Sequence, residues 1–419
     1  MKISPKSKKL MLFFTKNKHI HQVRQTKKTQ NILTELYYDI FEAYKHLIQL
    51  KKKLPYFSFT IQKIINANKI SKPQNFNSNA FPDVVRKHID LHSAYELTYT
   101  FSLYNRKIKI IFVVEDVNVE LKLDTYHKYV DSIIMWMCIL NKYASKTCSK
   151  TLVVYLYFTS LEKKIPLSNI YTLNEIHVNT AFTTTCPKDS EIVIFRHEEW
   201  LKVLIHESFH NFALDFSDMD NRDAHNYILN IFRVKSDVNL YESYTEFWAE
   251  IMNALFCSFF SLKDKTDIAD FLKHSHFFIN FERTYSFFQM VKVLRFMGLE
   301  YKDLYLTKKE NIISRENLYK ENTSVLSYYI IKCILMNNYQ GFLSSCKTNN
   351  STLLQFKKTV SNQLQYCKFI ENNYRTKTML ENVRETEIFF YKNNKNNKLN
   401  NQNFQYILSN LRMSICELG

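Results

Sequence analysis

The sequence predicts an α+β fold, with a small mixed sheet followed by a mostly α-helical C-terminal region. Residues 95–115 alternate polar and apolar side chains on either side of Asn105-Arg106, which is typical of a β-hairpin. The apolar run at 151–159 indicates a buried strand. Beyond residue 215, apolar side chains recur at helical spacing almost to the end of the chain. A chain of 419 residues is long enough to bury a large core.

The same periodicities predict further elements. The expected helices lie at 31–53, 124–144 and 241–262, with two shorter ones within 266–298, and further strands lie at 175–183 and 191–195. Composition divides the chain into parts. We expect a basic flexible arm at 1–30, an N-terminal helical segment at 31–82, a mixed domain at 83–262 and a helical region at 263–392. The last part, 393–419, is expected to be a low-complexity link at 393–403 and a terminal helix at 404–418.

The charge of the chain is strongly positive. It carries 57 Lys and Arg against 40 Asp and Glu, a formal net charge of +17. Residues 1–30 contain nine basic residues and no acidic one, so we expect a solvated arm there. The functional alternatives for such a segment are contact with nucleic acid or with another acidic surface.

Composition also excludes several classes of protein. The chain has 3 glycines, so a Gly-rich phosphate loop is excluded. The apolar run at 10–14 is too short for a secretory signal, and the longer one at 133–140 is too short for a transmembrane segment. The 8 cysteines form no C-x-x-C pair, which predicts an intracellular, non-secreted protein with buried free thiols.

One short motif carries recognisable chemistry. His206, Glu207 and His210 form the pattern H-E-x-x-H. Residues four apart lie on one face of a helix, so both imidazoles can reach a single metal ion. Glu207 projects beside the open position of that ion, where a water molecule needs a base. The motif therefore predicts a site for one Zn²⁺ ion.

A catalytic zinc site needs a third protein ligand. Glu242, Glu246 and Glu250 share one stripe of an otherwise apolar helix, where unpaired carboxylates would be costly. We favour Glu246 as the ligand and Glu250 as a hydrogen-bond acceptor from a ligand histidine. The competing register has Glu242 as the ligand and Glu246 as that acceptor. Asp215, five residues after His210, is another candidate for such support.

The motif and the later glutamates carry a family resemblance. H-E-x-x-H followed by a glutamate on a later helix resembles the gluzincin zinc peptidases, and the E-F-W-A-E at 246–250 is similar to the third-ligand segment of anthrax lethal factor. Residues 150–260 also resemble uncharacterised proteins of large DNA viruses. The resemblance implies a zincin-like catalytic domain at 83–262, with His206, His210 and Glu246 as zinc ligands and Glu207 as general base.

The metzincin group is a poorer match. Ala213 and Phe216 stand where a metzincin would carry a glycine and a third histidine. The viral resemblance implies a protein of the host cytoplasm or of a virion.

The implied activity is zinc-dependent hydrolysis of peptide bonds in a peptide or protein substrate. The candidate hydrogen-bond donors to the oxyanion are Tyr241, Tyr244, Tyr328 and His225. By analogy, the strand at 175–183 is expected to be an edge strand, at which Asn179 and Thr180 offer backbone groups to the substrate. The alternative function is that of a catalytically inactive zincin-fold virion protein with a structural or nucleic-acid-binding role.

Overall fold

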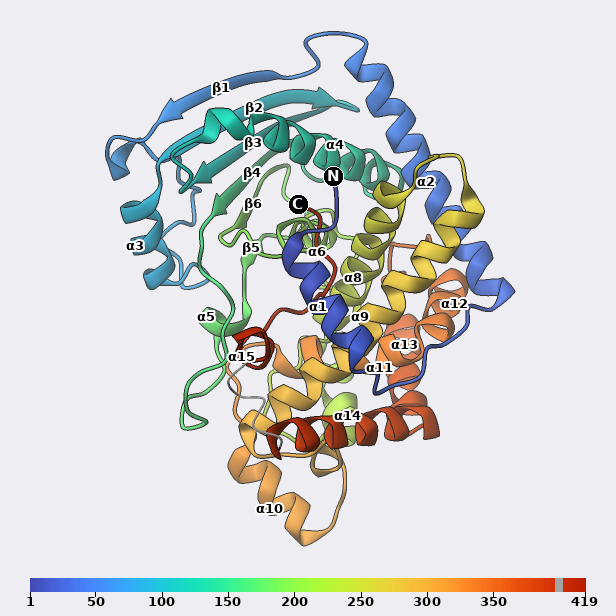
Figure 1. Ribbon diagram of the computed structural model, residues 1–419. Coiled ribbons are helices and arrows are strands. Elements are labelled where there is room, and N and C mark those ends of the chain that lie inside the picture. Colours follow the sequence, from blue (N-terminus) through green and yellow to red (C-terminus); the bar gives the residue numbers. More distant parts are fainter. Residues whose placement is uncertain (396–401) are drawn as a thin grey trace.

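A six-stranded mixed sheet lies on one side of the molecule, and helices fill the other (Figure 1). The computed structural model describes residues 1–395 and 402–419. The strands are β1 (Ser58–Lys63), β2 (Tyr95–Leu103), β3 (Arg106–Val114), β4 (Thr151–Phe158), β5 (Ala181–Thr183) and β6 (Asp189–Ile194). Their order across the sheet is β1-β2-β3-β4-β6-β5, so the described sheet has β1 and β5 at its edges.

The remaining described elements are almost all helical. The α-helices are α1 (Pro5–Lys16), α2 (Lys27–Lys51), α3 (Asp83–His92), α4 (Leu123–Tyr143), α5 (Glu175–Val178), α6 (Trp200–Asn211), α7 (Arg222–Ile231), α8 (Leu240–Ser261), α9 (Ile268–Met297), α10 (Lys309–Leu318), α11 (Lys332–Asn337), α12 (Tyr339–Asn349), α13 (Val360–Asn373), α14 (Lys377–Lys395) and α15 (Gln402–Ser409). A π-helical segment, Leu326–Ile331, leads directly into α11. The helices predicted at 31–53, 124–144 and 241–262 are confirmed as α2, α4 and α8.

The sheet combines antiparallel and parallel pairs. β2 and β3 form the predicted hairpin, but its turn is one residue earlier than the predicted Asn105-Arg106. Tyr104 and Asn105 form the turn, at positive φ (49° and 63°). β3 and β4 are parallel because α4 crosses between them. β4 and β6 are also parallel, and β5 closes the series antiparallel to β6. One edge of the sheet is therefore a short strand that follows α5.

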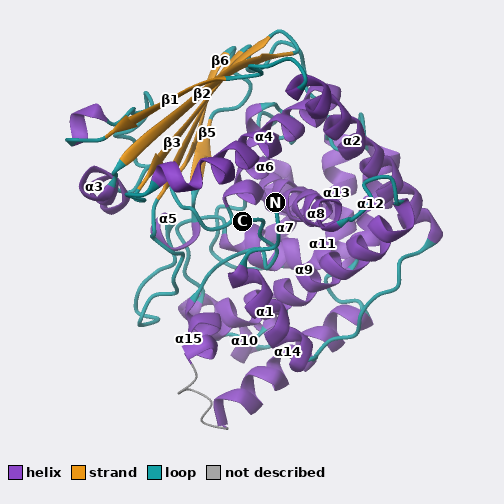
Figure 2. Ribbon diagram, turned by 45° about the horizontal axis from the view of Figure 1, so that its top comes forward, coloured by secondary structure: helices purple, strands orange, loops and turns teal. Residues whose placement is uncertain are grey.

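The two faces of the sheet are covered by different elements. Along β3, Ile110 and Phe112 point into the main core, whereas Ile111 and Val113 point into a smaller core on the opposite face. α3 covers the smaller core, and α4 and α6 lie over the main one (Figure 2). The candidate motif on α6 is thus packed against the sheet.

The polar strand predicted at 175–183 is confirmed only in its last three residues. Residues Glu175–Val178 form α5, whose first turn is closed by reciprocal hydrogen bonds between Asn174 and His177. The strand itself is reduced to the three residues of β5. The hydrogen bonds between Asn174 and His177 favour a helical turn, whereas the alternating pattern favours an extended strand. The helical turn forms in residues 175–178.

The predicted break within 266–298 is wrong, because α9 is one helix of 30 residues. The polar side chains that suggested a break bond to the carbonyl groups of the helix itself. Ser275 donates to the carbonyl of Phe271, and Asn280 donates to that of His276 (both 2.8 Å).

The end of the chain also differs from prediction. The helix expected across 404–418 is limited to α15, and the link at 393–403 includes residues 396–401, which lie outside the described residues. The segment 410–419 runs extended through the interior, where Ile415 and Cys416 are fully buried. The carboxylate of Glu282 on α9 accepts hydrogen bonds from both backbone N–H groups (3.0 and 2.9 Å). In a helix these N–H groups would have donated to carbonyl groups of the same helix. Here they donate to Glu282 and hold the terminal segment in place.

The prediction of a flexible arm at 1–30 is wrong. α1 buries Leu10, Met11 and Phe14 to 2%, 7% and 2% exposure, and it contacts α9. The ring of Phe14 packs edge-on against Phe288, with centroids 5.2 Å apart. The high charge of this segment conceals an amphipathic helix, because its lysines and its apolar residues occupy different faces.

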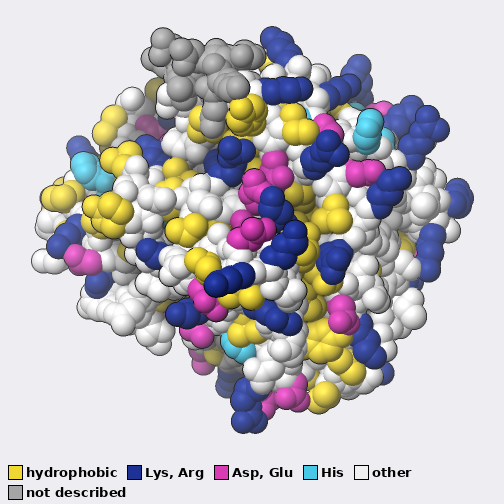
Figure 3. All heavy atoms as spheres, turned by 90° about the horizontal axis from the view of Figure 1, so that it is seen from below, with side chains coloured by type: hydrophobic (Ala, Val, Ile, Leu, Met, Phe, Trp, Pro, Cys, Tyr) yellow, Lys and Arg dark blue, Asp and Glu magenta, His cyan; other side chains and the backbone are white. Residues whose placement is uncertain are grey.

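The positive charge of the segment remains at the surface. Lys8, Lys9 and Lys16 of α1 are exposed. On the face of the molecule shown in Figure 3, Lys and Arg side chains are interspersed with Asp and Glu. Basic and acidic side chains are therefore mixed on that face.

One prediction about the cysteines is also wrong. Cys148 and Cys186 form a disulfide, and the other 6 of the 8 are free as expected. The bond joins the segment before β4 to the segment after β5. These two segments meet because β4 and β6 pair in parallel, which a sequence without a C-x-x-C pattern does not indicate.

The expected parts of the chain share one core. Buried residues of α1, α2, α8, α9, α13 and the C-terminal segment belong to the same apolar cluster as the inner face of the sheet. The boundaries expected at residues 82 and 262 are therefore not interruptions of packing. Among the described residues, no helix combines the length and apolarity needed to cross a membrane.

We expect Phe14→Ala to lower the free energy of unfolding by about 3–5 kcal/mol, because it opens a cavity between α1 and α9. Urea unfolding followed by circular dichroism measures the change. Leu12→Ala is the matched control, since Leu12 lies on the same helix and is 59% exposed. Equal stability of the two variants would mean that α1 is not docked in solution.

Candidate metal centre

α6 begins at a tight turn that Glu199 makes possible. Glu199 has a φ of 60°, in the left-handed region, and directly precedes the helix. Its carboxylate accepts hydrogen bonds from the backbone N–H groups of Met413 and Ser414 (3.0 and 2.6 Å). All residues of α6 are buried, so the imidazoles of His206 and His210 must find their partners within the protein.

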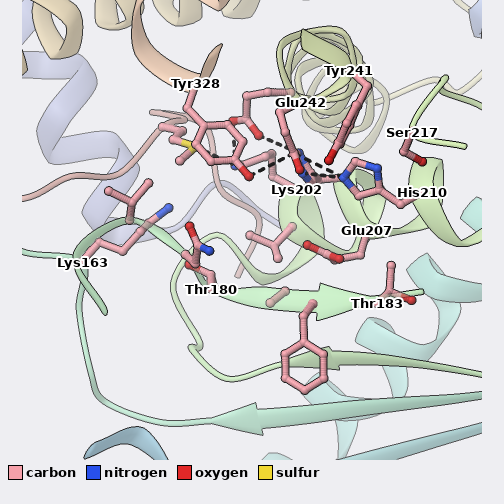
Figure 4. A pocket seen from close by; sticks show the side chains of 18 of the residues that line it. Lys163, Thr180, Thr183, Lys202, Glu207, His210, Ser217, Tyr241, Glu242 and Tyr328 are labelled. Atoms are coloured by element: carbon pink, nitrogen blue, oxygen red, sulfur yellow. Dashed lines mark hydrogen bonds and ion pairs between the residues drawn. The ribbon is translucent and has the colours of Figure 1, made fainter. Parts of the chain in front are cut away.

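Three side chains bring metal-binding atoms together (Figure 4). The Nε2 atoms of His206 and His210 lie 3.2 Å apart. An Oε2 atom of Glu242, on α8, lies 3.1 Å from the first nitrogen and 3.3 Å from the second. Within the described part of the chain, this is the group of side chains whose ligand atoms converge closely enough for a metal ion.

The spacing of these atoms fits zinc. Tetrahedral coordination at about 2.0–2.1 Å places ligand atoms roughly 3.3 Å apart. The three measured separations lie between 3.1 and 3.3 Å. Two imidazoles and one carboxylate also form a donor set of the kind that catalytic zinc sites use.

The favoured assignment of Glu246 as the third ligand is wrong in this geometry, which matches the competing register. Oε2 of Glu246 lies 2.9 Å from Nδ1 of His206, the nitrogen that faces away from the other ligand atoms. Its Oε1 accepts a hydrogen bond from the ammonium of Lys202 (2.8 Å). The position of α8 relative to α6 decides whether Glu242 or Glu246 faces the histidines. The spacing in the sequence cannot decide this, because both glutamates lie on the same stripe of α8.

Asp215 supports the second histidine, as predicted. Its Oδ2 lies 2.5 Å from Nδ1 of His210, and Asp215 itself is fully buried. Each ligand histidine thus has one nitrogen on a carboxylate and the other directed at the shared centre. That arrangement fixes the ring orientation and increases the basicity of the inward nitrogen.

The prediction for Glu250 is wrong. Its carboxylate is bound by the ammonium of Lys332 on α11 (2.6 Å), which also donates to Ser286 on α9 (3.0 Å). Glu250 continues the stripe of Glu242 and Glu246, but its partner is a lysine of α11 and not a histidine of α6. It serves the packing of the helices.

The carboxylates control the protonation of the site. Burial lowers the pKa of His206 and His210, but the neighbouring carboxylates raise it more, so that both lie above the usual histidine value. Burial raises the pKa of Glu242, and the two histidines reverse this and hold it below the usual range. The centre therefore favours a positive charge between the histidines, which a metal ion also provides.

Glu207 lies beside this group and lines the same cleft (Figure 4). It is 8% exposed, and burial raises the pKa of its carboxyl group above the usual value. A carboxylate with raised basicity next to a metal position can accept a proton from water and release it again. Glu207 thus lies next to the candidate ligands, and its role as a base stays a prediction.

The four candidate oxyanion donors lie in different places. Tyr328, on the π-helical segment, donates from its hydroxyl to Oε2 of Glu242 (3.0 Å) and lines the cleft. Tyr241 also lines the cleft, with its ring 5.8 Å from that of His210. The prediction is wrong for Tyr244, whose hydroxyl donates to the carbonyl of Leu354 (2.9 Å), away from the site.

His225 does not belong to the site either. It lies on α7 and is not among the residues that line the cleft. The low specificity of a lone histidine explains this error. Tyr328 differs because a π-helical turn, a feature often found at functional sites, presents its side chain.

The cleft runs between α6 and the sheet edge at β5 and has a volume of about 260 Å³. The prediction that Asn179 and Thr180 offer backbone groups to a substrate is wrong. The N–H of Asn179 donates to Glu175, and the carbonyl of Thr180 accepts from Phe195 (2.8 and 2.9 Å).

The outward backbone groups belong to the next residues. Antiparallel pairing alternates inward and outward groups. Because Thr180 is bonded toward β6, Phe182 is also directed inward, and the backbone N–H and C=O of Ala181 and Thr183 point away from β6. β5 can pair with an extended peptide through these two residues.

Two lysines of the cleft were not found from the sequence. Lys202 lies four residues before His206, so the helical stripe could have indicated it. Lys163, in the segment after β4, gives no such signal because its partners lie far away in the chain. Both line the cleft.

The described residues thus define an α+β protein with a candidate three-ligand metal centre in a cleft at the sheet edge. Comparison of the chain with protein-family profiles, curated proteins and solved structures found no match.

We expect Glu242→Gln to reduce the bound zinc below one ion per chain. Glu246→Gln, the matched variant one turn away, should retain zinc with an affinity about 10–100-fold weaker, because it loses the support of His206. Elemental analysis after dialysis and competition with a chromophoric chelator measure the two effects. A larger loss in Glu246→Gln would restore Glu246 as the ligand.

Proposed function

We propose that the protein is a zinc-dependent metallopeptidase that hydrolyses peptide bonds. The observation that carries the proposal is the convergence of His206, His210 and Glu242 at tetrahedral spacing, with a carboxylate behind each histidine. Glu207 lies next to them, and a sheet edge forms the opposite wall of the cleft. Metal, base and peptide-binding edge are the three parts that such a reaction needs.

His206, His210 and Glu242 would hold the ion. A zinc ion held there would supply Lewis-acid chemistry, which polarises a carbonyl group and makes bound water more acidic. Glu207 accepts a proton from the attacking water and passes it to the leaving amine. Glu207 lines the cleft beside these side chains, so its carboxylate is placed to carry that proton between the two steps.

Tyr328 is the proposed donor to the developing oxyanion. Burial raises the pKa of its hydroxyl well above the usual tyrosine value, so the group keeps its proton. The hydroxyl already lies near the metal ligands, 3.0 Å from Glu242. A neutral donor held in a buried position stabilises negative charge as it forms.

The gluzincin resemblance supports the same function. The pattern of two histidines on α6 and a glutamate on a later helix is retained, with Glu242 in place of Glu246. An antiparallel edge strand beside the metal-binding helix suits an extended peptide. We therefore propose a zincin-like fold and a peptide or protein substrate, in the setting of a large DNA virus.

The competing interpretation is an inactive virion protein that binds nucleic acid. The exposed lysines of α1 leave a contact with an acidic surface open to the chain in either case. The two interpretations differ at Glu207, because only an enzyme needs a base there.

We expect Glu207→Gln to lower the rate of peptide hydrolysis by about 10²–10⁴-fold with zinc still bound, since the residue supplies proton transfer and is not a ligand. Cleavage of a denatured protein mixture, followed by mass spectrometry, measures the rate, and elemental analysis measures the metal. Wild-type protein that contains zinc and cleaves no faster than Glu207→Gln would favour the inactive virion protein.

We expect Tyr328→Phe to reduce kcat by about 10²–10³-fold with little change in KM, because a lost oxyanion donor acts on the transition state. Tyr241→Phe is the matched control from the opposite side of the cleft and should change kcat little. Steady-state kinetics of the wild type and the two variants, at equal zinc content, measure kcat and KM. The reverse result would make Tyr241 the donor.

A further inference from the structure

One end of the cleft is basic. Around the metal centre the polar side chains are mostly acidic, but near the N-terminal half of α6 the wall contains Lys163 and Lys202, which are 1% and 2% exposed. Figure 4 shows the side chain of Lys163 reaching into the cleft beside Thr180 and Tyr328. Two buried ammonium groups at one end of the cleft need partners, because an unpaired buried charge is costly.

The protein satisfies the two ammonium groups unequally. Lys202 donates to Glu246 at 2.8 Å and has Glu199 at 4.0 Å, so it serves to hold the site together. Lys163 has one carboxylate within ion-pair distance among the described residues, that of Glu199 at 2.6 Å. An ammonium group has three N–H donors. Lys163 therefore has donors left for a ligand in the cleft.

Glu199 does not depend on Lys163 alone. Its other oxygen accepts two backbone hydrogen bonds from the C-terminal segment. Burial raises its pKa, but Lys163, Lys202 and Arg412 together lower it to about 2. The ammonium of Lys163 can thus be shared with a second anion without leaving Glu199 unpaired.

Lys163 is also held rigidly. Its backbone N–H donates to the carboxylate of Glu198, and its carbonyl accepts from the N–H of Leu411 (3.0 Å). The backbone of Lys163 is thus fixed on both sides of its Cα atom, and its buried side chain is held by Glu199. A donor restrained in this way loses little conformational freedom when a ligand binds.

A second unused donor lies in the same wall. Thr180 is 5% exposed, and its hydroxyl oxygen has no hydrogen-bond partner within the described part of the protein. Its carbonyl, directly before β5, accepts a hydrogen bond from the N–H of Phe195 (2.9 Å). The backbone of Thr180 is therefore held in place. A buried hydroxyl without a partner is costly, and a ligand acceptor would remove that cost.

We propose that Lys163 and Thr180 form a carboxylate-binding subsite, so that the substrate carries a carboxylate close to the bond that is hydrolysed. The assignment to a substrate rests on the proposed peptidase function. One carboxylate oxygen accepts from the ammonium and the other from the hydroxyl, a charge-assisted pair of hydrogen bonds. The carboxylate comes from an Asp or Glu side chain or from the C-terminus of the peptide.

Binding is measured by fluorescence anisotropy with zinc-loaded Glu207→Gln protein, so that no peptide is cleaved. Three pools of short peptides carry a neutral dye. The first has one Glu and an amidated C-terminus, the second has a free C-terminal carboxylate and no acidic side chain, and the third has neither. We expect the first or the second pool to bind about tenfold more tightly than the third, and the preferred pool identifies the source of the carboxylate.

Two variants in the same background assign the preference. Lys163→Met and Thr180→Val should each abolish or strongly reduce it, whereas Lys164→Met, at the neighbouring and 64% exposed lysine side chain, should retain it. Thr180→Val removes a hydroxyl that has no partner in the described protein, so Tm should not fall. This variant keeps the test decisive if Lys163→Met does not fold.

Equal binding of the three pools, no binding of any pool, or a preference that survives in Thr180→Val would overturn the subsite. A carboxylate preference in a protein that never hydrolyses peptides would leave the subsite standing and remove the peptidase proposal. Hydrolysis without the preference would do the reverse.

Discussion

Burial of carboxylates around α6 and α8 is the constraint on which the rest of the structure depends. Glu199, Glu246 and Glu250 are each at most 1% exposed. A buried charge without a partner costs several kcal/mol, so each of these side chains needs a positive or donating neighbour. Lys163 pairs with Glu199 and Lys202 pairs with Glu246. Lys332, on α11 and beyond α9 and α10 in the chain, pairs with Glu250. The helical second half of the chain therefore neutralises a buried carboxylate of α8, the helix that also carries Glu242.

The two ends of the chain take part in the same support. The C-terminal segment gives its backbone N–H groups to Glu199 and Glu282, so it cannot form a helix there. The N-terminus then pairs with this segment, with Ile3 opposite Leu418. α1 is docked through that pairing and through its own apolar face. A segment that looks like a solvated arm by its charge is thus a part of the core.

Two neighbouring helices, α6 and α8, supply most of the side chains of the candidate site. α6 supplies both imidazoles and Glu207, and α8 supplies a carboxylate at the shared centre and another behind His206. Asp215 holds His210 in the same way from the loop after α6. The cleft that results is acidic at its centre and basic at the end formed by Lys163. A ligand that spans the acidic centre and the basic end has to present differently charged groups at neighbouring positions. This requirement is a basis for selectivity.

The sequence by itself determined the α+β class, the β2–β3 hairpin, the apolar helices and the triplet His206, Glu207 and His210. These follow from periodicity and from the four-residue repeat of a helix, which are local properties. The choice of Glu242 over Glu246 was decided only in three dimensions, because equal spacing along α8 makes the two equivalent until α6 is placed against one of them. Lys163, Thr180 and the Cys148–Cys186 pair likewise depend on segments that meet through the sheet. Local pattern specifies which groups a helix can present, and packing between distant segments decides which of them meet.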